Sequence, residues 1–165
     1  MKKVLFSLFI AMIAATTIHA GIREEICPKL KVRMTLSEVI DTLKLQGYNK
    51  VTEDDYLGMN HISFVNWDTY KVWSLSFVDG KLAEIYIGTD KEKNLKTEKR
   101  LIEEYKLKPE RKWAKYTKLG YTYAKFYILT EVHEAWAFLE EPTGYSILIL
   151  NEEGLLREES QYTPQ

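Results

Sequence analysis

The stretch from Trp73 to Ile87, WSLSFVDGKLAEIYI, decides the fold. Apolar and polar residues alternate on both sides of the pair Asp79-Gly80, as they do in strands that bury one face. A two-residue hairpin turn needs positive φ at both central positions, which Asp-Gly supplies at little strain. We therefore expect two antiparallel strands here, with these residues on the buried side: Trp73, Leu75, Phe77, Leu82, Ile85 and Ile87.

Residues 1–20 have the composition of a secretory signal peptide. Lys2-Lys3 precede the apolar run 4–15, and Ala20 ends the segment with a small residue. The run of about a dozen residues is shorter than the roughly 20 needed to cross a bilayer. We expect cleavage after export to the periplasm or the medium, and a retained anchor or a buried helix is the alternative. No second apolar run of that length follows, so we expect no membrane span after signal removal.

The composition is that of one folded domain. The chain has 165 residues, of which 45% are hydrophobic and 28% charged. Without Lys2 and Lys3, 21 basic residues face 24 acidic ones, and a net charge of about −3 argues against a nucleic-acid partner. Cys27 is alone, so no internal disulfide can form and the core must hold the fold. This thiol is either structural or part of an intermolecular disulfide.

Two helices are expected. Thr35 and Glu38 have the spacing of a capping box, and Gly47 ends the helix that follows. A second helix is expected over 95–106, with Pro109 beyond its end. Strands are expected over 59–66, 70–78, 82–88, 121–130, 132–139 and 145–150. The remaining segments are expected to be a lead-in linker (21–34), a polar loop (48–57), an irregular basic segment (107–118) and a flexible tail (151–165).

The fold class is therefore α+β, with two αβββ units that form antiparallel sheet packed by helices. A single domain spans 35–150, with pseudo-repeats 35–88 and 95–150. At an offset of 62 residues Val39 aligns with Leu101, and one residue of slippage aligns Trp73 with Trp136. A tandem duplication explains this, but any two segments of this element order align in pattern, so both readings stay open.

The first unit resembles a known family. Met34 to Val39 at a helix start, followed by an aromatic strand and then by Phe77-x-x-Gly80-x-Leu82-x-x-Ile85, is similar to the SmpA/OmlA-type small outer-membrane lipoproteins. The same helix-plus-hairpin unit resembles the repeat of the β-lactamase inhibitor protein fold. The resemblance covers about residues 32–88 and, more weakly, the second half. It implies an exported, non-enzymatic module that binds proteins. The chain departs from both, because Cys27 is not at a lipidation position and cannot form the inhibitors' disulfides.

Catalytic and metal-binding patterns are weak. Glu131 and His133 would share a strand face, but two ligands are too few for a metal unless Asp54 or Asp55 joins them. The serines at 63, 74, 76 and 146 fall within expected strands and not in the strained turn of a nucleophile. No glycine-rich phosphate loop or dinucleotide turn is present in the sequence. We therefore expect no catalytic residues, no cofactor and no metal.

One stretch, 105–127, has an unusual composition. It combines seven basic residues and six tyrosine or tryptophan residues with a single acid, Glu110, whereas 131–159 has eight glutamates and one basic residue, Arg157. Such a stretch suits a polyanion, a glycan or an acidic protein surface, and the alternative is a solvated segment that complements those glutamates. The candidate partner-binding residues are Trp67, Lys112, Trp113, Lys115, Tyr116 and Tyr121.

Two functions follow from these patterns. The first is an exported bacterial envelope protein, an assembly factor or inhibitor-like module, that binds another envelope or secreted protein without catalysis. The second is a small secreted enzyme of unassigned class with a cleft between the two units.

Overall fold

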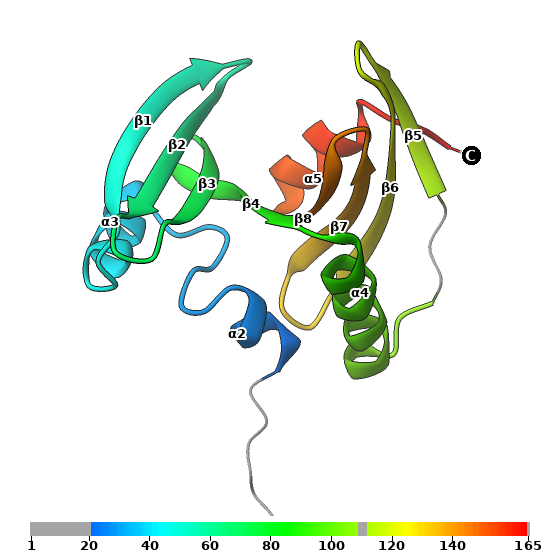
Figure 1. Cartoon of the computed structure of the whole chain (residues 1–165), viewed down its shortest axis with the longest axis horizontal. Helices are drawn as coiled ribbons and strands as arrows, with labels where there is room; N and C mark the ends of the chain where they lie inside the picture. The colour runs from blue at the N-terminus through cyan, green and yellow to red at the C-terminus, as the bar shows by residue number, and fades with distance from the viewer. Residues whose placement is uncertain (1–20, 109–111, 165) are drawn as a thin grey trace, which may run out of the picture.

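The computed structural model describes residues 21–108 and 112–164 and has the expected α+β class (Figure 1). Within these residues, nine strands form one antiparallel sheet and four helices pack on it. In chain order the elements are α2 (Ile22–Ile26), α3 (Leu36–Lys44), β1 (Asn49–Tyr56), β2 (Met59–Asn66), β3 (Lys71–Val78), β4 (Lys81–Thr89), α4 (Lys91–Tyr105), β5 (Lys112–Thr117), β6 (Gly120–Leu129), β7 (Glu134–Glu141), β8 (Gly144–Leu150), α5 (Glu152–Glu159) and β9 (Thr163–Pro164). The expected signal peptide, together with Pro109, Glu110 and Arg111, lies outside the described residues.

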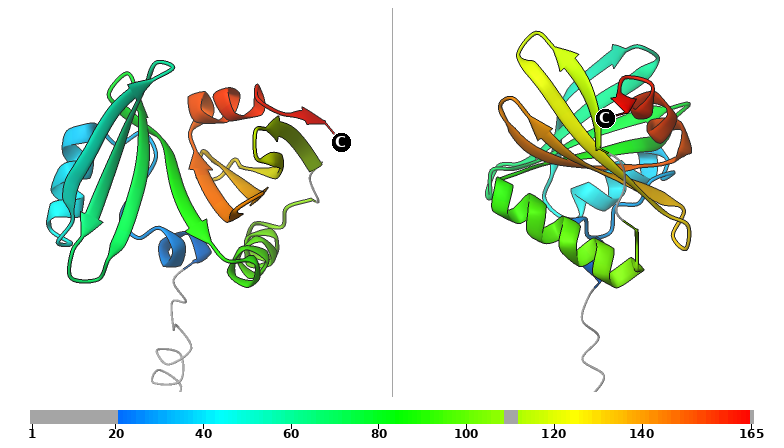
Figure 2. Two further views of the ribbon diagram at one scale, coloured as in Figure 1. Left: turned by 45° about the horizontal axis from the view of Figure 1, so that its top comes forward. Right: turned by 90° about the vertical axis from the view of Figure 1, so that its right-hand side faces the viewer.

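The sheet consists of two meanders joined along one seam. Its strand order is β1-β2-β3-β4-β8-β7-β6-β5-β9. The seam is the antiparallel pair β4–β8, which runs from Glu84 opposite Leu150 to Thr89 opposite Tyr145. Figure 2 shows β1–β3 and β5–β7 on opposite sides of this seam. The last strand of each half therefore lies at the centre of the sheet.

The two faces of the sheet carry different cores. The first face is covered by α2, α3 and α4, which contribute Ile22, Leu43 and Leu101 to a core that also contains Trp136 and Ile149. The second face has a smaller core, which α5 and the residues after it cover. It contains Phe126, Ala137, Leu148 and Tyr162, with Leu155 packed against them. In Figure 2, α5 accordingly lies on the side opposite α4.

The two strongest local predictions are confirmed. The Thr35 side chain accepts a hydrogen bond from the Glu38 backbone N–H, and the Glu38 carboxylate accepts one from the Thr35 backbone N–H. Asp79 and Gly80 have φ values of 49° and 73°, and β3 and β4 pair across them. A bulge between Ser76 and Phe77 shifts the register of this hairpin, a detail that the alternation did not predict.

The expected number of strands per unit is not met, because four strands follow α3 and four follow α4. The additional strands are β1, in the expected polar loop, and β5, in the expected irregular segment. All of β1 is exposed, so it has no apolar alternation from which a strand could be read. Lys112 to Thr117 does not alternate cleanly either, because Lys112 and Tyr116 are exposed on the same side of the strand as the buried Ala114.

The flexible tail expected over 151–165 is also corrected. Residues 152–159 form α5, and the Asn151 side chain caps this helix by accepting a hydrogen bond from the Gly154 backbone N–H at 2.8 Å. Tyr162 then packs edge-on against Phe126, with 5.7 Å between ring centroids. The Asn151 cap, the half-buried Leu155 and the buried Tyr162 are enough to fix this segment, although Glu152 and Glu153 face solvent. In the lead-in segment, residues 22–26 likewise form α2.

Candidate interaction surface

The six candidate residues do not lie together. Trp67 lies in the turn between β2 and β3, in the first half of the sheet, and is 59% exposed. The other five lie on the β5–β6 hairpin, in the second half: Lys112, Trp113, Lys115, Tyr116 and Tyr121. Trp67 is therefore not part of the same surface.

Strand geometry divides the five hairpin residues between the two faces of the sheet, because successive side chains point to opposite sides. Trp113 is half-buried on the second face and packs against Phe126 with ring centroids 6.4 Å apart. Lys115 donates a hydrogen bond to the Gln161 side chain at 3.0 Å, and its Nζ lies 4.8 Å from the centre of the Tyr162 ring. Trp113 and Lys115 thus already contact residues at the C-terminal end of the chain and are less available to a partner.

The opposite face of the hairpin presents a row of tyrosines, which we call the tyrosine surface: Lys112, Tyr116, Tyr121 and Tyr123. Tyr116 and Tyr121 are 74% and 56% exposed, and their ring centroids lie 5.2 Å apart. The Tyr121 ring stacks on that of Tyr123 at 6.1 Å, and Lys112 Nζ lies 3.9 Å from the Tyr123 centroid. Aromatic contacts and the cation hold the rings in place before any partner binds.

A cavity of about 210 Å³ adjoins the tyrosine surface, between α4 and strands β6 to β8. Tyr123 and Tyr145 line it, as does the Lys125–Glu98 ion pair, in which Nζ and Oε1 are 2.8 Å apart. Glu98 also accepts a hydrogen bond from the Tyr127 hydroxyl at 2.6 Å. Tyr123 and Lys125 belong to the stretch 105–127 that its composition distinguished, but the sequence did not predict Glu98 and Tyr145, whose contribution depends on how α4 packs. The alternation Tyr121-x-Tyr123 was the signal for two rings on one face.

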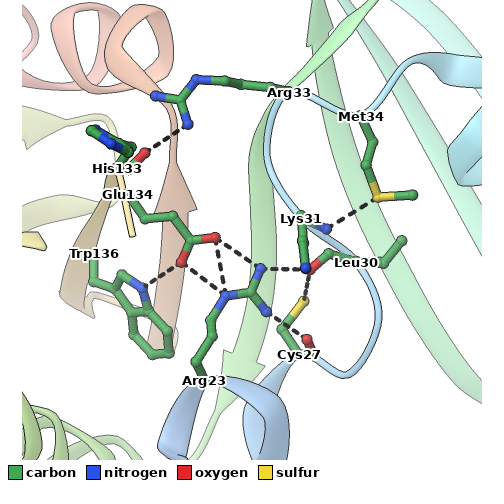
Figure 3. Close-up of polar contacts among 9 residues, drawn as sticks. All are labelled: Arg23, Cys27, Leu30, Lys31, Arg33, Met34, His133, Glu134 and Trp136. Atoms are coloured by element: carbon green, nitrogen blue, oxygen red, sulfur yellow. Dashed lines mark hydrogen bonds and ion pairs between the residues drawn. The ribbon is translucent and has the colours of Figure 1, made fainter. Parts of the chain in front are cut away.

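A buried ion pair connects the N-terminal helix to the centre of the sheet (Figure 3). The Arg23 guanidinium donates to both Glu134 oxygens, at distances of 2.8 to 3.1 Å, and Trp136 Nε1 donates to Glu134 at 3.3 Å. The same guanidinium donates to the carbonyl oxygens of Cys27 and Leu30. Burial alone would lower the pKa of Arg23, but the hydrogen bonds and charge of Glu134 raise it overall. We assign this group to the stability of the fold.

Cys27 belongs to the same buried region. The residue is fully buried, and its Sγ lies 3.8 Å from the Leu30 carbonyl oxygen. Burial raises the pKa of the thiol to about 11, although Arg23 opposes the shift. The thiol is therefore protonated at neutral pH and shielded from a second molecule, which argues for the structural alternative over the intermolecular disulfide.

The two histidines of the described chain do not form a catalytic or metal centre. His133 lies in the β6–β7 turn with φ of 53°, so it does not share a strand face with Glu131 as expected. His61 Nδ1 is 2.9 Å from Ser76 Oγ, but Ser76 is only 4% exposed in the middle of β3. A serine in that position cannot meet a substrate from solvent. Across residues 21–108 and 112–164, no group of three or more His, Cys, Asp or Glu side chains is arranged to hold a metal ion.

Comparison of the chain with protein families, with curated proteins and with solved structures finds no match. The resemblance to the envelope lipoproteins and to the inhibitor fold thus stays a prediction. No helix in the described part of the chain is long and apolar enough to cross a membrane.

Proposed function

We propose that this chain is an exported protein-binding module that engages its partner through the tyrosine surface of the β5–β6 hairpin. The observation that carries the proposal is the Tyr116–Tyr121 pair, two large rings in contact with each other and largely open to solvent. Tyrosines are enriched among the residues that dominate binding energy, because they bury much area and lose little entropy. Export and an envelope location rest on the composition of residues 1–20 and on the family resemblance.

An acidic protein surface is the partner that suits this hairpin best. Lys112 lies within the tyrosine surface, and Lys118 is exposed in the β5–β6 turn beside Leu119. Lys115 and Lys125 already have partners within the chain, so they contribute less. Exposed aromatic rings with the exposed cations Lys112 and Lys118 beside them favour a partner that supplies carboxylates around an apolar centre.

We further propose that the two halves of the sheet arose by duplication. Each half consists of one helix followed by a four-stranded meander, and the halves meet along equivalent strands, β4 and β8. The enzyme alternative requires accessible polar groups that converge in a cleft between the halves. The buried Ser76–His61 contact does not supply them.

Affinity capture from an envelope extract, with the mature protein as bait, tests the binding proposal. We expect wild-type protein to retain a discrete partner and the double variant Tyr116→Ala/Tyr121→Ala to lose it. The matched control is Tyr56→Ala/Tyr70→Ala, which removes two exposed tyrosines from the first half. Thermal unfolding of all three proteins establishes that the substitutions leave the fold intact. Equal capture by the two double variants would reject the tyrosine surface.

A further inference from the structure

The C-terminal strap, residues 151–164, covers the second face of the sheet (Figure 1). Its helix rests on β4: the Asn151 backbone N–H donates to the Ala83 carbonyl oxygen at 2.9 Å. At Gly154, an added Cβ would be 2.5 Å from the same oxygen, so only glycine allows this approach. Leu155 and Tyr162 then insert into the core of the second face. The strap is therefore a docked segment and not a loose end.

The end of the strap occupies the edge of β5, the first strand of the hairpin that carries the tyrosine surface. In the described chain, β9 pairs with only two residues of β5, Thr163 with Ala114 and Pro164 with Trp113. Proline has no backbone N–H to donate, so this pairing is short and weak. An extended segment of a partner would make longer pairing at the same edge. The strap and such a partner segment would therefore compete for the same edge of β5.

Three carboxylates lie near Tyr162 where the strap meets the sheet, two of them on the sheet and one on the strap. Glu84 comes from β4, Glu141 from the end of β7 and Glu158 from α5, and all three act electrostatically on Tyr162. The Tyr162 hydroxyl is buried and has no hydrogen-bond partner among the described residues. The other polar and charged groups that face this cluster are Lys115 from β5, Ser76 from β3 with His61 behind it, Tyr86 from β4, Ser146 from β8 and Gln161 from the strap.

We propose that residues 151–164 form a strap that detaches from the sheet at alkaline pH, when these three carboxylates are charged together, and that its detachment opens the β5 edge to an extended partner segment. The inference rests on the proposed function of the hairpin and adds its regulation. Among residues 21–108 and 112–164, Lys115 is the one cation that acts on both Glu84 and Glu158, so one positive charge opposes three negative ones. The missing partner of the Tyr162 hydroxyl adds to the free energy that docking must overcome.

The protonation behaviour of the cluster agrees with this arrangement. Burial, and then the charge of Glu158, raise the pKa of Glu84 to about 7, although Lys115 and a hydrogen bond from Ser76 oppose the shift. Burial likewise raises the pKa of Glu158. A raised carboxyl pKa means that the docked state binds a proton more tightly than the detached state. Docking is therefore strongest in acid and weakens as pH rises through neutrality.

Hydrogen exchange at about pH 5.5 and about pH 8.5, corrected for intrinsic rates, measures the detachment without any partner. If Glu84 regains its ordinary pKa of 4.5 on detachment, protection of 151–164 should fall roughly thirtyfold between the two conditions, while α3 stays unchanged. Glu84→Gln should remove most of this loss. Glu140→Gln, an exposed glutamate on the same sheet, is the matched control and should behave as wild type. Equal protection at both pH values, or an equal loss in Glu84→Gln, would overturn the inference.

Partner capture at the two pH values tests the β5 edge. We expect wild-type protein to capture more partner at the higher pH, and Glu84→Gln to show little increase. An increase of equal size in both proteins would overturn the link between strap and hairpin. The two proposals can fail separately. If the Tyr116→Ala/Tyr121→Ala variant captures as much partner as wild type, the proposed function is rejected. If hydrogen-exchange protection of 151–164 does not depend on pH, only the proposed detachment of the strap is rejected.

Discussion

The Arg23–Glu134 pair offers the sharpest test of what holds the N-terminal segment to the sheet. Only 14% of the Arg23 side chain and 6% of the Glu134 side chain are exposed, so both charges are largely removed from water. Glu134→Ala leaves the guanidinium buried without its counter-ion, with only the carbonyls of Cys27 and Leu30 as acceptors. Loss of one partner of a buried pair costs about 3–5 kcal/mol, and we expect this destabilisation here.

A double-mutant cycle separates the pair from the packing around it. Arg23→Met removes the cation, Glu134→Leu removes the carboxylate, and Arg23→Met/Glu134→Leu removes both charges and fills the space. No uncompensated charge remains in the double variant. Its loss of unfolding free energy should therefore be about 2–3 kcal/mol smaller than the sum of the losses in the two single variants. Urea denaturation followed by circular dichroism measures all four free energies of unfolding.

The exposed pair Arg100–Glu25 is the matched control. Its side chains are 37% and 53% exposed, so Glu25→Ala should cost less than about 1 kcal/mol. If the losses at Arg23 and Glu134 simply add, or if Glu134→Ala costs no more than Glu25→Ala, the pair does not anchor the segment.

Three further predictions concern the buried core and the strap. Burial raises the pKa of Glu84 from 4.5 to about 7. As pH rises through that interval, wild-type protein should therefore lose about 3 kcal/mol of unfolding free energy relative to Glu84→Gln. Urea unfolding measures this, and free energies that change with pH by the same amount in both proteins would contradict it. Gly154→Ala should destabilise by about 1–3 kcal/mol, since its Cβ would meet the Ala83 carbonyl, whereas Gly144→Ala has open space; equal melting temperatures of the two variants would refute the close approach. Cys27 should resist iodoacetamide in the native protein and react in urea, and rapid native labelling followed by mass spectrometry would show that the thiol is accessible.

The parts of the fold that were predictable are those in which local chemistry and burial agree. The capping box at Thr35 and the Asp79-Gly80 turn each satisfy backbone groups within a few residues, so their signals do not depend on the rest of the sheet. The strand β1 was missed for the opposite reason. It is an edge strand whose exposed side chains carry charge, and only pairing with β2 makes it a strand.

The candidate surface was half predictable. Composition indicated the stretch, and strand alternation would have placed Tyr116 and Tyr121 on one face if β5 had been recognised. Composition could not show that the chain's own C-terminus covers Trp113 and Lys115, because that contact joins segments far apart in sequence. The glutamates under the strap were equally hidden, since adjacent carboxylates such as Glu140 and Glu141 point to opposite faces and meet groups from other strands.

The β4–β8 seam has a consequence for how long the native state lasts. Each half of the sheet is a meander whose contacts join neighbouring strands and therefore form early in folding. The seam instead closes a long loop, from Thr89 to Tyr145 at its near end, and the loop entropy must be lost before its contacts can form. Contacts that form after the rate-limiting step act mainly on the unfolding rate. The lifetime of the folded chain, more than the speed at which it folds, should therefore depend on the packing of Ile85 against Ile149 across that seam.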